Sequence, residues 1–164
     1  MRAIHVYTDP LQHALIAAAV VAPLGRRAIR AAVVAALVID VDHAVAARSV
    51  RVRATTALAT RPRTHSLVTA VAAGTTVGFA RGPVEGWAVV GGLVSHLLHD
   101  AGDSAAPTPL LWPFAPARQL GRRRQLVFTA ALITISRVAA AASRRRTSAA
   151  GGGSGAATAP PRTA

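Results

Sequence analysis

Five apolar segments separated by short polar breaks constrain this chain more than any other feature of its sequence. They cover residues 11–24, 28–39, 67–80, 84–98 and 126–142. Hydrophobic residues make up 52% of the chain and charged residues 15%, too little charge to cover the surface of an ordinary soluble domain. We therefore predict an all-α, multi-pass membrane bundle of about four to five helices. Because a spanning helix needs about 20 residues, we expect the shorter segments to be tilted, partly inserted or extended by their polar ends.

Proline and glycine residues mark the breaks between these segments. Pro23 and Gly25 separate the first two, and Gly82 with Pro83 forms a tight turn between the third and fourth, so we predict two helical hairpins. Residues 105–121 are rich in proline and are predicted not to form a regular helix. After residue 142 the chain has no leucine, isoleucine or valine, which predicts a membrane-embedded domain at 1–142 and a disordered tail at 143–164. Residues 1–12 lack a basic leader with a cleavage site, so we expect the first helix to be retained.

The positive charge of the chain comes from arginine. The net charge is +13, and the arginines cluster between the apolar segments, as in membrane proteins whose basic loops stay in the cytoplasm. This placement argues against nucleic acid as a partner and favours membrane lipids. If the helices alternate in direction, Arg26, Arg27, Arg30 and Arg81 lie at one end and most other arginines at the opposite end. We therefore predict an integral membrane protein whose second end, which also carries the histidines, faces the cytoplasm.

Histidine and aspartate side chains gather at the ends of the predicted helices. In an antiparallel bundle the start of the first and third segments meets the end of the second and fourth. The residues so placed are His13, then Asp40, Asp42 and His43, then His65, then His96, His99, Asp100 and Asp103. The chain has no cysteine, so nitrogen and oxygen atoms would have to hold any metal ion. The pattern predicts a divalent metal site, with zinc first and manganese as the alternative.

Helical spacing assigns these side chains to faces. His96 and Asp100 are four residues apart and share one face, where both can reach a single ion. His99 and Asp103 repeat this spacing on a neighbouring face, where they would orient the ligands or hold a second ion. On a regular helix Asp40 and Asp42 point about 200° apart, so both can be ligands only if the helix ends there.

Four ordered strings resemble a known family. They are I-D-V-D-H at 39–43, R-P-R-T-H-S-L at 61–67, S-H-L-L-H-D at 95–100 and P-L-L-W-P at 109–113. Together with an early histidine matched by His13, they resemble the YdjM-type family of predicted membrane-bound metal-dependent hydrolases, over about residues 10–125. That family is distantly similar to zinc-dependent phospholipases C and single-strand nucleases, whose H-x-x-x-D pair is matched by His96 and Asp100.

The resemblance implies a ligand set and a class of reaction. The reaction is hydrolysis of phosphate esters, with phospholipid a natural substrate at a membrane face. Asp40 would be a further ligand or an orienting carboxylate. The metal ligands that the resemblance implies are His13, Asp42, His65, His96 and Asp100.

The chain departs from the family pattern at three positions. Thr60 stands where the family has histidine, Pro62 stands for glycine, and Asp103 replaces a threonine. A ligand is therefore missing from the pattern, and Asp103 is a candidate substitute.

A hydrolytic mechanism assigns further roles. A divalent ion lowers the pKa of a bound water, Asp40 or Asp103 would act as general base, and Arg61 or Arg63 would hold an anionic substrate. The alternative role of these arginines is to set topology or contact lipid headgroups. Two other classes of function compete. A transporter is disfavoured because the ionisable residues lie at helix ends and no internal repeat is present, whereas a non-catalytic membrane protein with a structural metal site remains the alternative.

Overall fold

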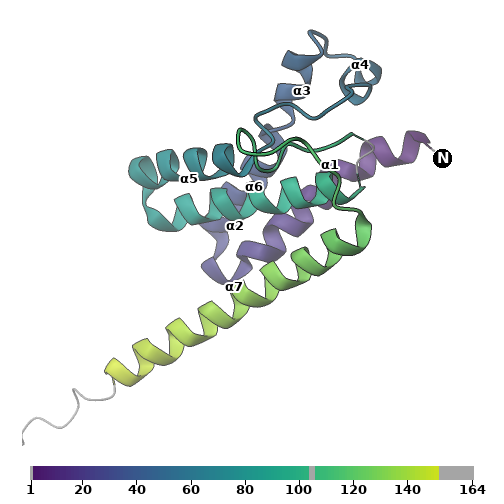
Figure 1. Cartoon of the computed structure of the whole chain (residues 1–164). Coiled ribbons are helices and arrows are strands. Elements are labelled where there is room, and N and C mark those ends of the chain that lie inside the picture. The colour runs from purple at the N-terminus through teal and green to yellow at the C-terminus, as the bar shows by residue number, and fades with distance from the viewer. Residues whose placement is uncertain (1, 104–105, 152–164) are drawn as a thin grey trace, which may run out of the picture.

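The computed structural model describes residues 2–103 and 106–151, and over these residues it consists of helices without a β-strand (Figure 1). The predicted all-α class is confirmed, and each of the five apolar segments forms a helix. The elements are α1 Arg2–Val21, η1 Ala22–Leu24, α2 Arg26–Val38, α3 Val41–Ala46, α4 Val52–Thr56, α5 Leu67–Arg81, α6 Pro83–Asp103 and α7 Arg122–Gly151.

Helix α6 is the centre of the bundle. It packs against α5, α2, α1 and α7, and its apolar side chains are buried along most of its length. Two core clusters lie on different sides of it, one formed mainly by α1 and α2 and the other shared with α5. Since α6 carries His96, His99 and Asp100 near its C-terminal end, its central position brings three neighbouring helices towards these residues.

Glycine and alanine allow the helices around α6 to approach closely. A Cβ atom added to Gly86 would lie 2.7 Å from the carbonyl oxygen of Gly74 and 2.8 Å from Cα of Gly78, both in α5. A Cβ on Gly92 would lie 2.8 Å from Cα of Ala32 in α2. Small residues at such contacts are typical of helices that associate within membranes, where backbone proximity replaces the burial of large side chains.

The two predicted hairpins are present, and glycine residues with positive φ form their turns. Gly25 (φ 92°) precedes α2, and Gly82 (φ 112°) separates α5 from α6. These angles lie in the region that favours glycine because other residues would place Cβ against the backbone. Both hairpins leave the His- and Asp-bearing ends of α2, α5 and α6 together at the opposite end of the bundle (Figure 1).

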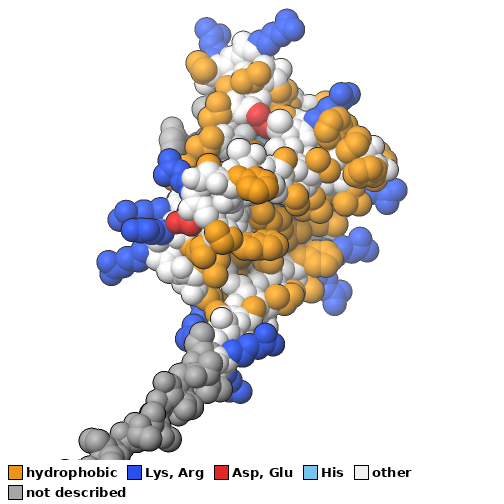
Figure 2. All heavy atoms as spheres, turned by 90° about the vertical axis from the view of Figure 1, so that its left-hand side faces the viewer, with side chains coloured by type: hydrophobic (Ala, Val, Ile, Leu, Met, Phe, Trp, Pro, Cys, Tyr) orange, Lys and Arg blue, Asp and Glu red, His pale blue; other side chains and the backbone are white. Residues whose placement is uncertain are grey.

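Within residues 2–103 and 106–151, one helix is long and apolar enough to cross a membrane. This is α7 over Arg122–Arg146, which has a mean hydropathy of 1.7 and is almost entirely unburied. The apolar stretches Asp9–Leu24 and Leu67–Arg81 are shorter. The surface seen in Figure 2 is apolar over much of its area, with arginines around its margins. The number of crossings therefore stays a prediction.

Two helices extend further than the sequence patterns suggested. Helix α1 begins at Arg2, so His13 lies within it and not at its start. Helix α7 continues to Gly151, into the segment predicted to be a disordered tail, because alanine and arginine are strong helix formers even without apolar side chains to bury. The rest of that tail, residues 152–164, lies outside the described residues.

Candidate metal centre

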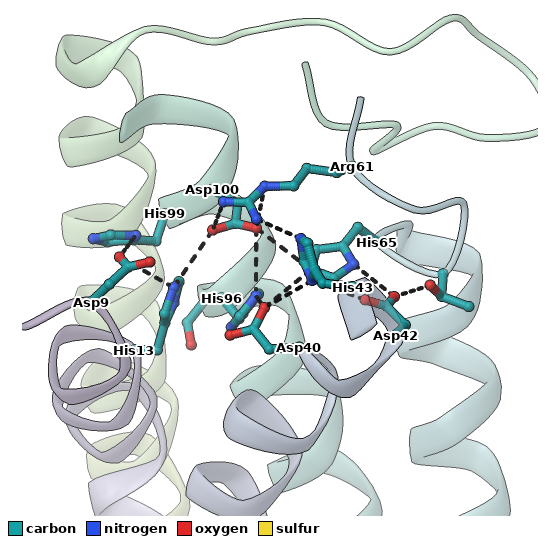
Figure 3. Close-up of polar contacts among 12 residues, drawn as sticks. Asp9, His13, Asp40, Asp42, His43, Arg61, His65, His96, His99 and Asp100 are labelled. Carbon is teal, nitrogen blue, oxygen red and sulfur yellow. Dashed lines mark hydrogen bonds and ion pairs between the residues drawn. The ribbon is translucent and has the colours of Figure 1, made fainter. Parts of the chain in front are cut away.

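Five buried histidines and four aspartates meet at one end of the bundle (Figure 3). They come from α1, from the α2–α3 junction, from the loop before α5 and from α6. The structure thus brings the sequence-predicted ligands together. The residues are Asp9, His13, Asp40, Asp42, His43, His65, His96, His99 and Asp100.

Four of these residues form a closed ring of alternating oxygen and nitrogen atoms. Oδ1 of Asp40 lies 3.6 Å from Nε2 of His65 and 3.4 Å from Nε2 of His96. Oδ2 of Asp100 lies 3.5 Å and 3.6 Å from the same two nitrogens. These separations exceed the roughly 2.7–2.9 Å of a charge-assisted hydrogen bond. Each of the four is close to the distance of about 3.3–3.6 Å between neighbouring ligands of one zinc ion. Ligand atoms of Asp40, His43, His65 and Asp100 lie within 4.8 Å of one another, as do those of His13, His96 and Asp100. We call Asp40, His65, His96 and Asp100 the inner group.

The ring atoms also lack the hydrogen bonds that buried polar atoms normally make. Nε2 of His65, Nε2 of His96 and Oδ2 of Asp100 are buried without a hydrogen-bond partner. An unsatisfied buried polar atom costs free energy, and a cation among these atoms would satisfy all of them at once. The donor set of two imidazoles and two carboxylates therefore fits a borderline divalent ion.

A second set of ligand atoms, from Asp9, His13 and His99, lies beside the first, and we call these three residues the outer group. Oδ1 of Asp9 lies 3.6 Å from Nε2 of His13 and 3.7 Å from Nδ1 of His99. Nε2 of His13 is also 3.5 Å from Oδ1 of Asp100. Asp100 therefore turns one carboxylate oxygen towards each group, as Figure 3 shows. Because Asp100 is only 2% exposed, neither oxygen is satisfied by bulk solvent.

Hydrogen bonds on the far side of two rings fix which nitrogen faces the ligand atoms. Nδ1 of His65 lies 3.0 Å from Oδ2 of Asp42, so Nδ1–H donates to this carboxylate and Nε2 is left with its lone pair towards the inner group. Nε2 of His99 lies 3.0 Å from Oε1 of Gln12, which leaves Nδ1 for the outer group. A histidine that binds metal typically has this kind of second partner, which sets its tautomer and its orientation.

The break between α2 and α3 decides the positions of the two neighbouring aspartates. Helix α2 ends at Val38, Asp40 lies in the turn, and Asp42 lies in the first turn of α3. The two side chains can therefore face the same cluster, which a regular helix through both residues would have prevented. Asp40 belongs to the inner group, whereas Asp42 contacts the Nδ1 sides of His43 and His65 and accepts a hydrogen bond from Thr64. These contacts favour an orienting role for Asp42, whose assignment as a ligand stays a prediction.

The loop before α5 is fixed at both ends, which positions His65. Ser66 caps α5 by accepting a hydrogen bond from the backbone N–H of Thr69. The backbone N–H groups of Arg61 and Leu67 donate to the carbonyl oxygens of Pro107 and Leu110, at 3.0 and 2.9 Å. The proline-rich segment after α6 thus holds the histidine-bearing loop against the cluster.

Arg61 lies directly on the inner group. Its Nε atom is 3.1 Å from Oδ2 of Asp100 without hydrogen-bond geometry, and its Nη2 donates to Oδ1 of Asp100 at 3.3 Å. It also contacts Nε2 of His43. Arg63 instead lies over the ring of Trp112, 5.8 Å from its centroid. Of the two arginines considered for an anionic substrate, the structure brings Arg61 to the site.

Asp103 lies apart from both groups. Its carboxylate is exposed and pairs with Arg122 at 3.3 Å. The structure therefore does not bring Asp103 to the ligand atoms, where it would have replaced a missing ligand or acted as general base. Asp9, which the sequence reasoning missed, instead lies in the outer group beside His13 and His99. The available signal was its spacing, since Asp9 precedes His13 by four residues just as His96 precedes Asp100.

The charges of the loop residues suit a cation. Burial by itself raises the pKa of Asp40, but contacts with His65 and His96 outweigh it and hold this pKa below its usual range. The pKa of Asp42 is likewise lowered by His43, His65 and Thr64 against the effect of burial. Burial lowers the pKa of His65, but Asp40 and Asp42 outweigh it and raise this pKa. Because an imidazole must be unprotonated at the nitrogen that binds a metal ion, protonation of His65 would compete with metal binding.

Replacing Asp42 with alanine tests its role. If Asp42 only orients His43 and His65, we expect the affinity for zinc to fall by roughly 10- to 100-fold while the stoichiometry at saturating zinc is unchanged. Competition titration with a fluorescent chelator measures both quantities. Thr64→Val, which removes only the hydroxyl contact with Asp42, is the control and should weaken binding less. A reduced stoichiometry at any zinc concentration would identify Asp42 as a ligand.

Comparison with known protein families identifies the family of this chain. The family model described as YdjM inner membrane protein matches residues 9–159, which include both ligand groups and α7. The resemblance inferred from the four strings is thereby confirmed. No curated protein and no solved structure matches the chain.

Proposed function

The chain belongs to the YdjM inner membrane protein family, and from this premise we propose that it is a membrane-bound, metal-dependent hydrolase of phosphate esters or lipids. The observation that carries the proposal is the inner group, in which two carboxylate oxygens lie 3.4–3.6 Å from two imidazole nitrogens. We propose zinc as the ion because mixed nitrogen and oxygen ligands suit it.

An accessible edge of the cluster favours catalysis over a purely structural metal. His65 and His96 are fully buried, but the side chains of Asp40 and Asp9 are 37% and 46% exposed. A structural site closes its ion with protein ligands, whereas a catalytic site leaves a position for water or substrate. The exposed carboxylates mark the side from which water and substrate would enter.

The residues at this edge have distinct roles in the proposed reaction. A bound divalent ion would supply a Lewis acid and would lower the pKa of a neighbouring water. Arg61 would donate hydrogen bonds to a phosphoryl oxygen and hold the ester against the inner group. Asp40 would accept the proton of the attacking water through Oδ2, the oxygen that does not face the imidazoles, as the new P–O bond forms, and the leaving alkoxide would take up a proton as its bond to phosphorus breaks.

We further propose that the protein crosses the membrane several times with the metal centre on the cytoplasmic side. Helix α7 has the length and hydropathy of a spanning helix. Ten arginines lie at the end with the histidines, whereas Arg26, Arg27, Arg30 and Arg81 lie at the hairpin end, where a crossing by α7 also places Arg144, Arg145 and Arg146. The excess of arginine near the metal centre supports a cytoplasmic location of this end.

The function is tested by hydrolysis assays on the full chain in detergent. We expect zinc-loaded protein to cleave bis(p-nitrophenyl) phosphate or phospholipids, and we expect a chelator or His96→Ala to lower the rate to background. Asp103→Asn should retain the activity, because Asp103 pairs with Arg122 away from the ligand atoms. Stoichiometric zinc without hydrolysis of any ester would favour the structural metal site. A protein that binds no metal would exclude both.

A further inference from the structure

A large cavity lies between α2 and α5, near the α5–α6 turn. Its volume is about 1040 Å³, and α6 contributes Val89 to its wall. Both α2 and α5 pack on α6, so the cavity is a groove between two helices that share one neighbour. Arg27 and Arg30 of α2 and Arg81 of α5 line it, with Glu85 of α6.

The arginines of this cavity have no anionic partner in the described part of the chain. Among the residues that the structure describes, no carboxylate lies within ion-pair distance of Arg27, Arg30 or Arg81. Three cationic side chains thus face one acid in the lining. The cavity therefore carries an excess of positive charge that is complementary to an anionic group.

Below the arginines the groove is apolar. Val34, Val38 and Val77 form its walls. A second groove of about 490 Å³ shares Ala35, Val38 and Val89 with it and continues towards the metal-centre end. Unpaired cations at one end of a long apolar groove match a ligand with an anionic head and an aliphatic chain.

The surroundings of the cavity are typical of the headgroup region of a bilayer. Phe79 and Trp87, on the same hairpin as Arg81, are 90% and 70% exposed. Figure 2 faces this part of the bundle and shows apolar side chains with arginines at the margins and few acids. Exposed aromatic residues beside arginines are a feature of membrane–water interfaces.

We propose that the groove between α2 and α5 binds one anionic phospholipid. The phosphate lies on Arg27, Arg30 and Arg81, and an acyl chain lies along Val34, Val38 and Val77. The inner membrane family supplies the setting in which such a lipid is present. This inference does not depend on hydrolytic activity, because the arginines lie at the end of the bundle opposite the metal ligands.

Native mass spectrometry of delipidated full-length protein tests the proposal. We expect phosphatidylglycerol to bind with one molecule per chain and more tightly than phosphatidylcholine. Each arginine near an anionic lipid contributes about fivefold in affinity, so Arg30→Gln combined with Arg81→Gln should weaken phosphatidylglycerol binding roughly 25-fold. The matched control, Arg51→Gln with Arg53→Gln, removes the same charge from exposed positions outside the groove and should change the affinity by less than about twofold.

A second variant tests the apolar part of the site. Val34→Trp fills the groove without changing any charge and should also weaken phosphatidylglycerol binding. An unchanged circular dichroism spectrum in every variant verifies that the bundle is folded, whether or not the protein binds zinc. Equal affinity for the two lipids, equal losses in the two double variants, or displacement of the lipid by millimolar inorganic phosphate would each overturn the proposal.

Discussion

Asp100→Asn is expected to remove bound metal from this protein, with zinc affinity falling by more than about 100-fold, beyond the range for loss of an orienting partner. The reason is that Asp100 turns Oδ2 towards His65 and His96 of the inner group and Oδ1 towards His13 of the outer group. An amide carries no charge and offers only one oxygen, so neither group keeps its ligand set. Elemental analysis after gel filtration, together with chelator competition, measures the loss.

Asp103→Asn is the matched control for this experiment. It makes the same chemical change on the same helix, but Asp103 is exposed and pairs with Arg122. We expect this variant to bind metal like the wild type. If Asp100→Asn keeps stoichiometric zinc, or if both variants lose it, Asp100 does not have the shared position that the geometry gives it. Circular dichroism of both variants separates loss of metal from loss of fold.

Local patterns were sufficient to predict the helices and the end of the bundle where the ligands meet. The Gly82-Pro83 pair predicts a tight turn because a regular helix rarely continues through it. This turn makes α5 and α6 antiparallel. Given this, His65 just before α5 and His96 near the end of α6 must lie at the same end. The pair His96 and Asp100 needed only the helical period.

Assignment of roles within the cluster required the tertiary structure. The sequence shows that Asp40 and Asp42 cannot share a face of one helix, but it does not show where α2 ends. That break gives Asp40 the position in the inner group and leaves Asp42 behind His65. Asp9 was missed because α1 was expected to begin only near residue 11, which left Asp9 outside any helix.

The hydrogen bonds that hold the His65 loop against the segment after α6 also could not be predicted from local sequence patterns. Backbone hydrogen bonds from Arg61 to Pro107 and from Leu67 to Leu110 join segments more than forty residues apart in sequence. No period or motif in one segment specifies its partner in the other. The P-L-L-W-P string could therefore be recognised as part of a pattern, but its structural role could not be derived from the sequence.

Gly92→Ala is expected to destabilise the bundle by about 1–3 kcal/mol, the typical cost of overpacking. A Cβ at this position would contact the carbonyl oxygen of Ala32 and lie 2.8 Å from its Cα and 2.9 Å from its carbonyl carbon. These are backbone atoms, so no rotamer change relieves the contact and α2 must move away from α6. The midpoint of thermal unfolding in detergent, followed by circular dichroism, measures the effect.

Gly78→Ala is the control for this substitution. The nearest atom to its added Cβ, Cα of Gly86, is 3.7 Å away, an ordinary contact. Alanine is favoured over glycine in a helix by about 1 kcal/mol, so this variant should be as stable as the wild type or more stable. The same preference acts at position 92, and a net loss there means that the contact with Ala32 outweighs it.

The packing at Gly92 also links the core to the metal centre. Asp40 directly follows α2, whereas His96 and Asp100 belong to α6, so the spacing of these two helices sets the distances within the inner group. Gly92→Ala should therefore lower zinc affinity as well as stability, although it lies a full helical turn from His96 and touches no ligand. If the variant unfolds at a lower temperature but binds zinc like the wild type, the two helices are not rigidly coupled to the site. If it is as stable as Gly78→Ala, the close contact between α2 and α6 does not exist in the folded protein.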